Sequence, residues 1–171
     1  STEMLMRKPG IVALHACTTT NAMHYAHRHT FNDETRRFLL LQNASFLTMF
    51  RQRGGVKEGV SIDQFNPAGG APGLEEVFAE VSGHKMKAAQ KALAHLRAAK
   101  NPKPFIDEAQ RLIYLKGTGS HDYKFSSAVL EDYYSISPVM RDRFLAASTS
   151  WLQGSKKADS GLVARTRAAL T

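Results

Sequence analysis

Residues 32–55, NDETRRFLLLQNASFLTMFRQRGG, carry a strong helical pattern that sets the expectation for the rest of the chain. Asn32 is a favourable N-cap, and Asp33 and Glu34 place acidic side chains in the first turn, where the helix dipole favours them. Apolar residues then cover most of the helix circumference, and two glycines end the pattern. Because a helix that is apolar on all sides is normally buried, we predict a buried helix that ends near Arg53.

Helical patterns lie on both sides of this stretch, and no segment shows the alternation typical of a strand. The expected helices span Ile11–His29, Leu74 to about Lys100 with a break near Ser82-Gly83, Phe105 to Gly117, a helix capped by Ser120 that ends near Tyr134, Ser137-Pro138 to Gly154, and Leu162–Leu170. The sequence therefore predicts an all-α fold.

The segment at residues 54–73 is rich in glycine, proline and asparagine and carries no helical stripe. Loops of this length are uncommon in compact domains and often act as lids or flexible connectors. The chain has 171 residues, 43% of them hydrophobic, which suits one globular domain. We predict a compact multi-helix bundle over residues 1–171, with a long Gly/Pro-rich loop near 54–73.

Charge and cysteine content limit the classes of partner and location. Lys and Arg number 23 against 15 Asp and Glu, a net charge of +8, which favours anionic partners in general. The basic residues are scattered over several expected helices, so solvated helix faces are the preferred interpretation over nucleic-acid binding. No apolar run approaches the roughly 20 residues of a membrane span. A single cysteine, Cys17, and residues 1–10 without a leader pattern suit a cytoplasmic protein, unless a leader has been removed.

Seven histidines provide the candidates for a metal site. His24 and His27 share one helix face three residues apart, which is compatible with a two-histidine metal clip. A solvent-facing histidine cluster is the favoured alternative, because no carboxylate lies on that helix face at ligand spacing. His15 lies among small and apolar residues, and its pattern alone favours a hydrogen-bonded core histidine over a ligand. Thr19 belongs to the polar run one turn later, which needs hydrogen-bond partners or a ligand.

A second cluster lies in residues 120–127. His121 and Lys124 are three residues apart and project from one side of a helix. Lys124 precedes apolar residues, so we expect partial burial, which favours the neutral, reactive amine; an amphipathic helix with this lysine extended to water is the alternative. Asp122 either orients the imidazole of His121 or stabilises the helix N-terminus. Asp132, further along the helix, is expected to be solvated.

These residues together resemble a known family. Residues 14–23, LHACTTTNAM, resemble the histidine–small–Thr motif that opens the C-terminal half of the questin oxidase-like family. Residues 120–125, SHDYKF, resemble the second motif of that half, in which a histidine precedes a lysine on a helix. The apolar helix around Phe38–Phe50 is similar to the helix between the two motifs. The resemblance covers about residues 11–152.

The resemblance implies an all-helical, metal-dependent oxygenase that acts on aromatic polyketides such as anthraquinones. It makes His15 and His121 ligands of a divalent metal, with non-haem iron expected, and makes a carboxylated Lys124 the third ligand and catalytic residue. A lysine ammonium cannot ligate a cation, whereas its carbamate supplies an anionic oxygen that suits iron with open positions. Asp122 and Thr19 would hydrogen-bond around these ligands.

The resemblance also implies partners. The expected substrates are an aromatic small molecule and dioxygen, and a second subunit or a second copy of the chain is expected to complete the site. The chain is then the C-terminal half of a larger enzyme or one subunit of it. Two alternatives remain open: a non-catalytic helical interaction module and, less favoured, a basic nucleic-acid-binding helical domain.

Overall fold

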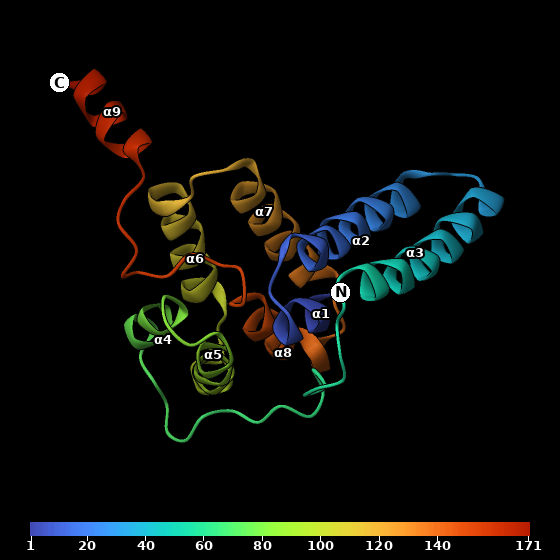
Figure 1. Ribbon diagram of the computed structural model, residues 1–171, viewed down its shortest axis with the longest axis horizontal. Helices are drawn as coiled ribbons and strands as arrows, with labels where there is room; N and C mark the ends of the chain where they lie inside the picture. The colour runs from blue at the N-terminus through green and yellow to red at the C-terminus, as the bar shows by residue number, and fades with distance from the viewer.

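The computed structural model describes all 171 residues and contains nine helices and no strand (Figure 1). The helices are α1 (Thr2–Arg7), α2 (Ile11–His29), α3 (Asp33–Arg53), α4 (Leu74–Val81), α5 (Lys85–Ala99), α6 (Lys103–Lys116), α7 (Ser120–Ser135), α8 (Pro138–Ser148) and α9 (Gly161–Leu170). The all-α prediction is confirmed. None of the helices is both long and apolar enough to serve as a membrane span.

Local signals explain most helix ends. Asn32 caps α3 as predicted, with its side-chain oxygen accepting a hydrogen bond from the Thr35 amide at 2.8 Å. The expected cap of α7 is wrong: Ser120 is the first helical residue, and the cap position belongs to Gly119. The helix that starts at Pro138 ends at Ser148 rather than at Gly154, because the chain leaves the helix in short turns there.

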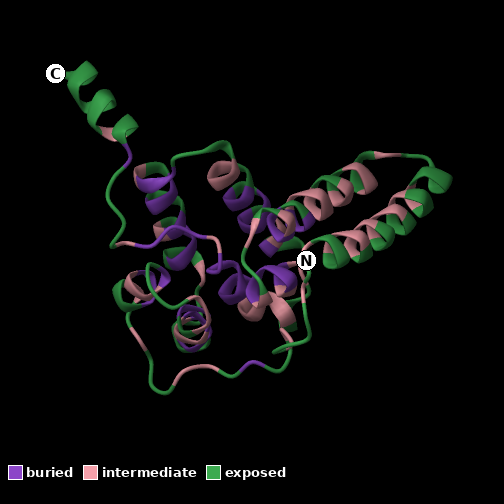
Figure 2. Cartoon of the chain, in the orientation of Figure 1, coloured by how far each residue is buried: buried purple, intermediate pink, exposed green.

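One hydrophobic core joins α1, the beginning of α2 and helices α4 to α8. Figure 2 shows the buried residues concentrated in this part of the chain. Fully buried side chains include Leu14, Phe78, Phe105, Phe125 and Leu145. Each such side chain contributes roughly 1.5–3 kcal/mol relative to an exposed position. The core therefore fixes α2 against α7 through the N-terminal part of α2.

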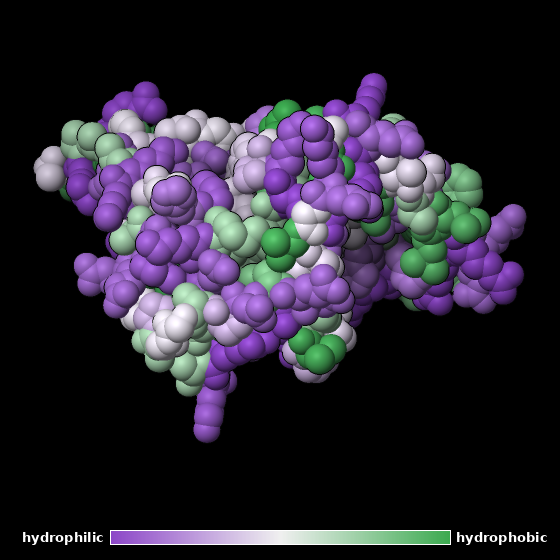
Figure 3. Space-filling view, turned by 60° about the horizontal axis from the view of Figure 1, so that its bottom comes forward, coloured by the Kyte–Doolittle hydropathy of each residue, from purple (hydrophilic) through white to green (hydrophobic).

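Helix α3 corrects the expectation of a buried helix, since none of its residues is buried. It packs along α2 to form a hairpin that projects from the rest of the molecule (Figure 1). Contact with α2 covers one side of α3 only, so Phe38 and Leu41 remain 61% and 71% exposed. Figure 3 shows hydrophobic side chains gathered at the end of the molecule that this hairpin forms. The apolar pattern is real, but within this chain α2 and the core cover only part of it, and Phe38 and Leu41 stay open to solvent.

Residues 54–73 cross the molecule from α3 to α4 without regular structure (Figure 1). The segment is nevertheless attached at its centre, because Phe65 is buried in the core. The Arg143 guanidinium donates to the Phe65 and Ile62 carbonyls at 2.7 and 3.1 Å. The Glu3 carboxylate accepts a hydrogen bond from the Ile62 amide at 2.9 Å. These contacts fix the middle of the segment to α1 and α8.

The contrast between α2 and α3 gives a stability prediction. Leu14→Ala removes a fully buried side chain and is expected to lower the free energy of unfolding by about 2–5 kcal/mol. Leu41→Ala on α3 removes an exposed side chain and is expected to change it by less than about 0.5 kcal/mol. Urea unfolding followed by circular dichroism, at a concentration where the chain is monomeric, measures both. A loss at Leu41 equal to that at Leu14 would contradict this arrangement.

Candidate functional site

Helices α2 and α7 bring the two predicted histidine ligands together. The imidazole rings of His15 and His121 lie with their centroids 5.3 Å apart and their planes at 77°. This is an edge-to-face arrangement, which aromatic rings commonly adopt. Further along the same two helices, the Asn21 side-chain amide donates a hydrogen bond to Asp132 at 2.9 Å, so the contact between the helices continues beyond the histidine pair. The core contact between the two helices thus brings one histidine from each helix to a common point.

Both imidazoles remain accessible. His15 is exposed rather than a core histidine, which corrects the interpretation based on its apolar neighbours; those neighbours, Leu14 and Ala16, face the core while His15 faces outward. His121 is half-buried. Among the histidines, only the side chains of His29 and His95 make hydrogen bonds within the chain. The ring nitrogens of the His15–His121 pair are therefore available to an external ligand.

The other residues of this predicted site are arranged differently. Lys124 is exposed, which corrects the expectation of partial burial, because it projects about 100° round the helix from the buried Phe125. Both oxygens of Asp122 are occupied away from His121, accepting hydrogen bonds from the Thr118 amide at 2.9 Å and from Gln153 at 3.0 Å. Thr19 is half-buried on α2. No third ligand therefore accompanies the histidine pair.

A second cluster forms around the alternative pair, His24 and His27. His24 Nδ1 lies 4.0 Å from an oxygen of Asp132. The same oxygen accepts a hydrogen bond from the side-chain amide of Asn21 at 2.9 Å. His24, His27 and Asp132 line a cavity of about 480 Å³ between α2, α3 and α7. At 1.5 Å per residue, His24 lies roughly 14 Å from His15 along α2, and Asp132 lies roughly 17 Å from His121 along α7.

Asp132 belongs to this cluster although its position in the sequence did not indicate it. It was expected to be solvated, yet its side chain is largely buried against α2. Burial raises the pKa of the Asp132 carboxyl above its usual value, and the Asn21 hydrogen bond and His24 oppose that rise. The apolar residues on both sides of Asp132 in α7, which turn this part of the helix inward, were the available signal.

The nucleophilic residues are not arranged for catalysis. Cys17 is buried, and burial raises the pKa of its thiol to about 11, so the thiolate is scarce at neutral pH. The Ser126 hydroxyl donates to the Tyr123 carbonyl within its own helix at 3.0 Å. These contacts leave the histidine clusters as the chemically distinctive features of the fold.

No group of three or more histidine, cysteine, aspartate or glutamate side chains is arranged to hold a metal ion. Comparison of the chain with models of protein families, with curated proteins and with solved structures finds no match.

The pKa of Asp132 gives a pH prediction. A raised folded-state pKa means that its contribution to stability is present at low pH and is lost as pH rises through that pKa. Asp132→Asn is therefore expected to raise the melting temperature at pH 7, and the difference from wild type should shrink as the pH falls through the acid range. Thermal unfolding from pH 3 to pH 8 measures this, with the exposed neighbour changed in Glu131→Gln as the control. A less stable Asp132→Asn protein at pH 7 would show that the Asn21 and His24 contacts outweigh burial.

Proposed function

We propose that the chain contributes His15 and His121 as two ligands of a divalent metal ion in a metal-dependent oxygenase of the questin oxidase-like type. The single observation that supports this proposal is the 5.3 Å separation of the two ring centroids. An ion about 2.1 Å from a ring nitrogen lies about 3.2 Å from the ring centroid, so two imidazoles on one ion have centroids about 4.5–5.2 Å apart at ligand angles of about 90–110°. The observed separation of 5.3 Å lies just above this range.

The chemical character of the two imidazoles also suits a metal ion. Neutral imidazole nitrogens are suitable ligands for iron, zinc and copper, and neither imidazole has a competing hydrogen bond within the chain. Iron held by imidazole and oxygen ligands with open positions would supply the ability to bind dioxygen next to an aromatic substrate. The role of His15 and His121 is to hold and orient the ion.

Two ligands leave the remaining positions to other groups. Lys124 lies one turn from His121, but its exposure removes the desolvation that favours a neutral amine and hence a carbamate. In the proposal, Lys124 becomes a ligand only when another surface covers this side of α7. A second subunit or a second copy of the chain would supply both that surface and the missing ligands.

Metal titration tests the proposal. Isothermal titration of the full chain with Zn²⁺ is expected to show one site, with affinity lowered about tenfold or more by His15→Ala and by His121→Ala. His84→Ala removes an exposed histidine from the start of α5 and serves as the matched control. Oxygen uptake with Fe²⁺ and a hydroxyanthraquinone, lost in the same two variants, tests the oxygenase itself.

Two results would contradict the proposal. One is binding that survives both substitutions in proteins whose circular dichroism is unchanged. The other is binding abolished by His24→Ala instead, which would place the ion at the alternative cluster near Asp132.

A second candidate function is a non-catalytic helical interaction module. The observation that favours it is the exposed apolar surface of α3, where Phe38 and Leu41 lie one turn apart. Isolated apolar residues are ordinary on protein surfaces, but a cluster of them is typical of an interface. A second copy of the chain is the simplest occupant to test.

Sedimentation velocity tests self-association through α3. The wild-type chain is expected to shift from monomer to dimer as its concentration rises, and Leu41→Glu is expected to hold it monomeric because the charge would be buried at the interface. Val139→Glu places the same charge on an exposed apolar position of α8 and provides the control. A wild-type chain that stays monomeric at every concentration, or equal effects of the two substitutions, would argue against this candidate.

A further inference from the structure

A cleft of about 940 Å³ lies between the α4–α5 turn and residues 150–157, which follow α8. Its two walls are tied together closely. The Ser155 amide donates to the Phe78 carbonyl at 2.9 Å, and the Lys156 amide donates to the Ser82 hydroxyl at 3.2 Å. A Cβ at Gly154 would lie 2.1 Å from the Ser82 hydroxyl oxygen, so only glycine permits this approach. These contacts fix the two walls of the cleft relative to each other.

Among the lysines that line this cleft, Lys85, Lys156 and Lys157 have no carboxylate partner, and two of them donate to uncharged oxygens. Lys85 Nζ donates to the Val81 carbonyl at 3.0 Å, and Lys157 Nζ donates to the Gln153 side-chain oxygen at 2.8 Å. Burial, and then repulsion from Lys157, lower the pKa of Lys85. Two like charges with uncharged partners leave this part of the cleft electropositive.

The carboxylates at the cleft are already engaged or lie at its edge. Glu80 pairs with Lys91 at 3.0 Å and with Lys87 at 3.5 Å. Asp122 accepts from Gln153 and from the Thr118 amide, and Glu76 is exposed. These acidic groups therefore do not pair with the two cleft lysines.

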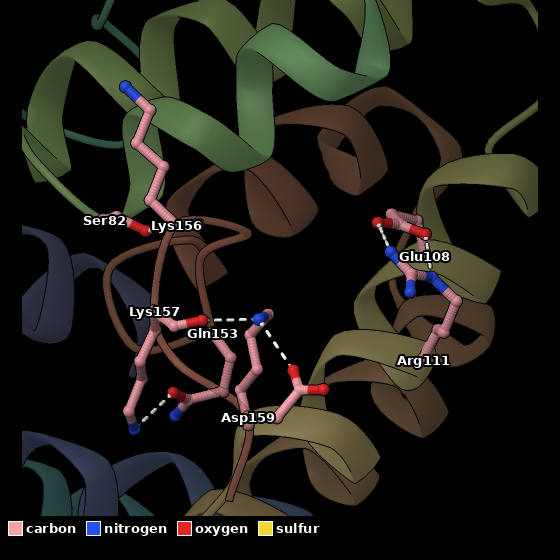
Figure 4. A network of polar contacts seen from close by, with 8 residues as sticks. Ser82, Glu108, Arg111, Gln153, Lys156, Lys157 and Asp159 are labelled. Carbon is pink, nitrogen blue, oxygen red and sulfur yellow. Dashed lines mark hydrogen bonds and ion pairs between the residues drawn. The ribbon is translucent and has the colours of Figure 1, made fainter.

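Figure 4 shows how the lysines of the 150–157 segment are directed. Lys157 extends toward Gln153, whereas Lys156 extends in the opposite direction along the neighbouring helices. Lys116 is occupied by Asp159 at 3.0 Å and by the Lys157 carbonyl. Lys157 is therefore the amine that this segment presents beside Gln153.

Two residues that line the same cleft carry buried hydrogen-bond donors without partners. Ser150 is 2% exposed, and its hydroxyl has no hydrogen-bond partner. The buried indole nitrogen of Trp151 also has none. Buried polar groups are normally paired, so two unpaired groups at one cleft indicate a missing acceptor. The N-terminus of α5 adds partial positive charge, because it has neither a side-chain cap nor an acidic residue in its first turn.

We propose that this cleft binds a phosphate group of a small molecule. The ammonium groups of Lys85 and Lys157 would balance the phosphate charge, and the Ser150 hydroxyl and the Trp151 indole would donate hydrogen bonds to its oxygens. A phosphate fits better than a single carboxylate, because it offers more acceptor oxygens and a second negative charge. The cleft volume lies within the range of small-molecule sites and leaves space for an organic group beside the phosphate.

The test uses the fluorescence of Trp151, the one tryptophan of the chain. Titration of the full chain with inorganic pyrophosphate is expected to give a saturable change in emission. Lys157→Gln and Lys85→Gln are each expected to raise the Kd about tenfold or more, because each removes a charged donor. Lys103→Gln removes the same charge from the start of α6, outside the cleft, and is expected to change the Kd by less than about twofold.

Parallel titrations identify the source of the phosphate. Ribose 5-phosphate represents soluble phosphate esters, and phosphatidylcholine vesicles containing phosphatidic acid represent lipid headgroups. Binding of any of these probes that depends on Lys157 supports the cleft and identifies its source. A lack of any emission change with all probes, or an equal loss of affinity in Lys103→Gln, would overturn the proposal. Because Lys157 is exposed, its variant is expected to fold even if Lys85→Gln does not.

Discussion

The packing of α2 against α7 is the contact on which the candidate site depends. Leu14 and Cys17 on α2 share one hydrophobic core with Phe125 and Val129 on α7. This core fixes the rotation of each helix, and the residues that face away from it are fixed as a consequence. His15 and His121 are such residues, and their convergence follows from apolar packing that involves neither imidazole.

Three features of the chain are incomplete without a further surface or further ligands. The His15–His121 pair has two of the ligands that a metal centre needs, Lys124 is exposed where its proposed chemistry requires desolvation, and α3 presents apolar side chains to solvent. A covering surface at each of these positions would complete it. The cleft near Lys85 and Lys157 lies between the α4–α5 turn and the segment after α8 and includes neither His15 nor His121, although Asp122 lines it.

The sequence predicted local features well and three-dimensional surroundings poorly. The Asn32 cap, the end of α2 at His29 and the break near Ser82 follow from interactions within a few residues, so they could be predicted. The burial of α3 depends on how many helices pack against it, and the apolar content of α3 does not determine that number. Asp132 became part of a cluster because α2 lies beside α7, and the unpaired donors at Ser150 and Trp151 likewise arise from packing between distant segments. The pairing of His15 with His121 was expected from a family resemblance rather than from periodicity.

Pulsed electron paramagnetic resonance of Cu²⁺ added to the purified chain tests the role of the histidine pair, because it counts the imidazoles bound to one ion. We predict modulation from two coordinated imidazoles, reduced to one in His15→Ala and in His121→Ala and unchanged in His24→Ala. A spectrum with a single imidazole in the wild-type chain, or one altered only by His24→Ala, would contradict it.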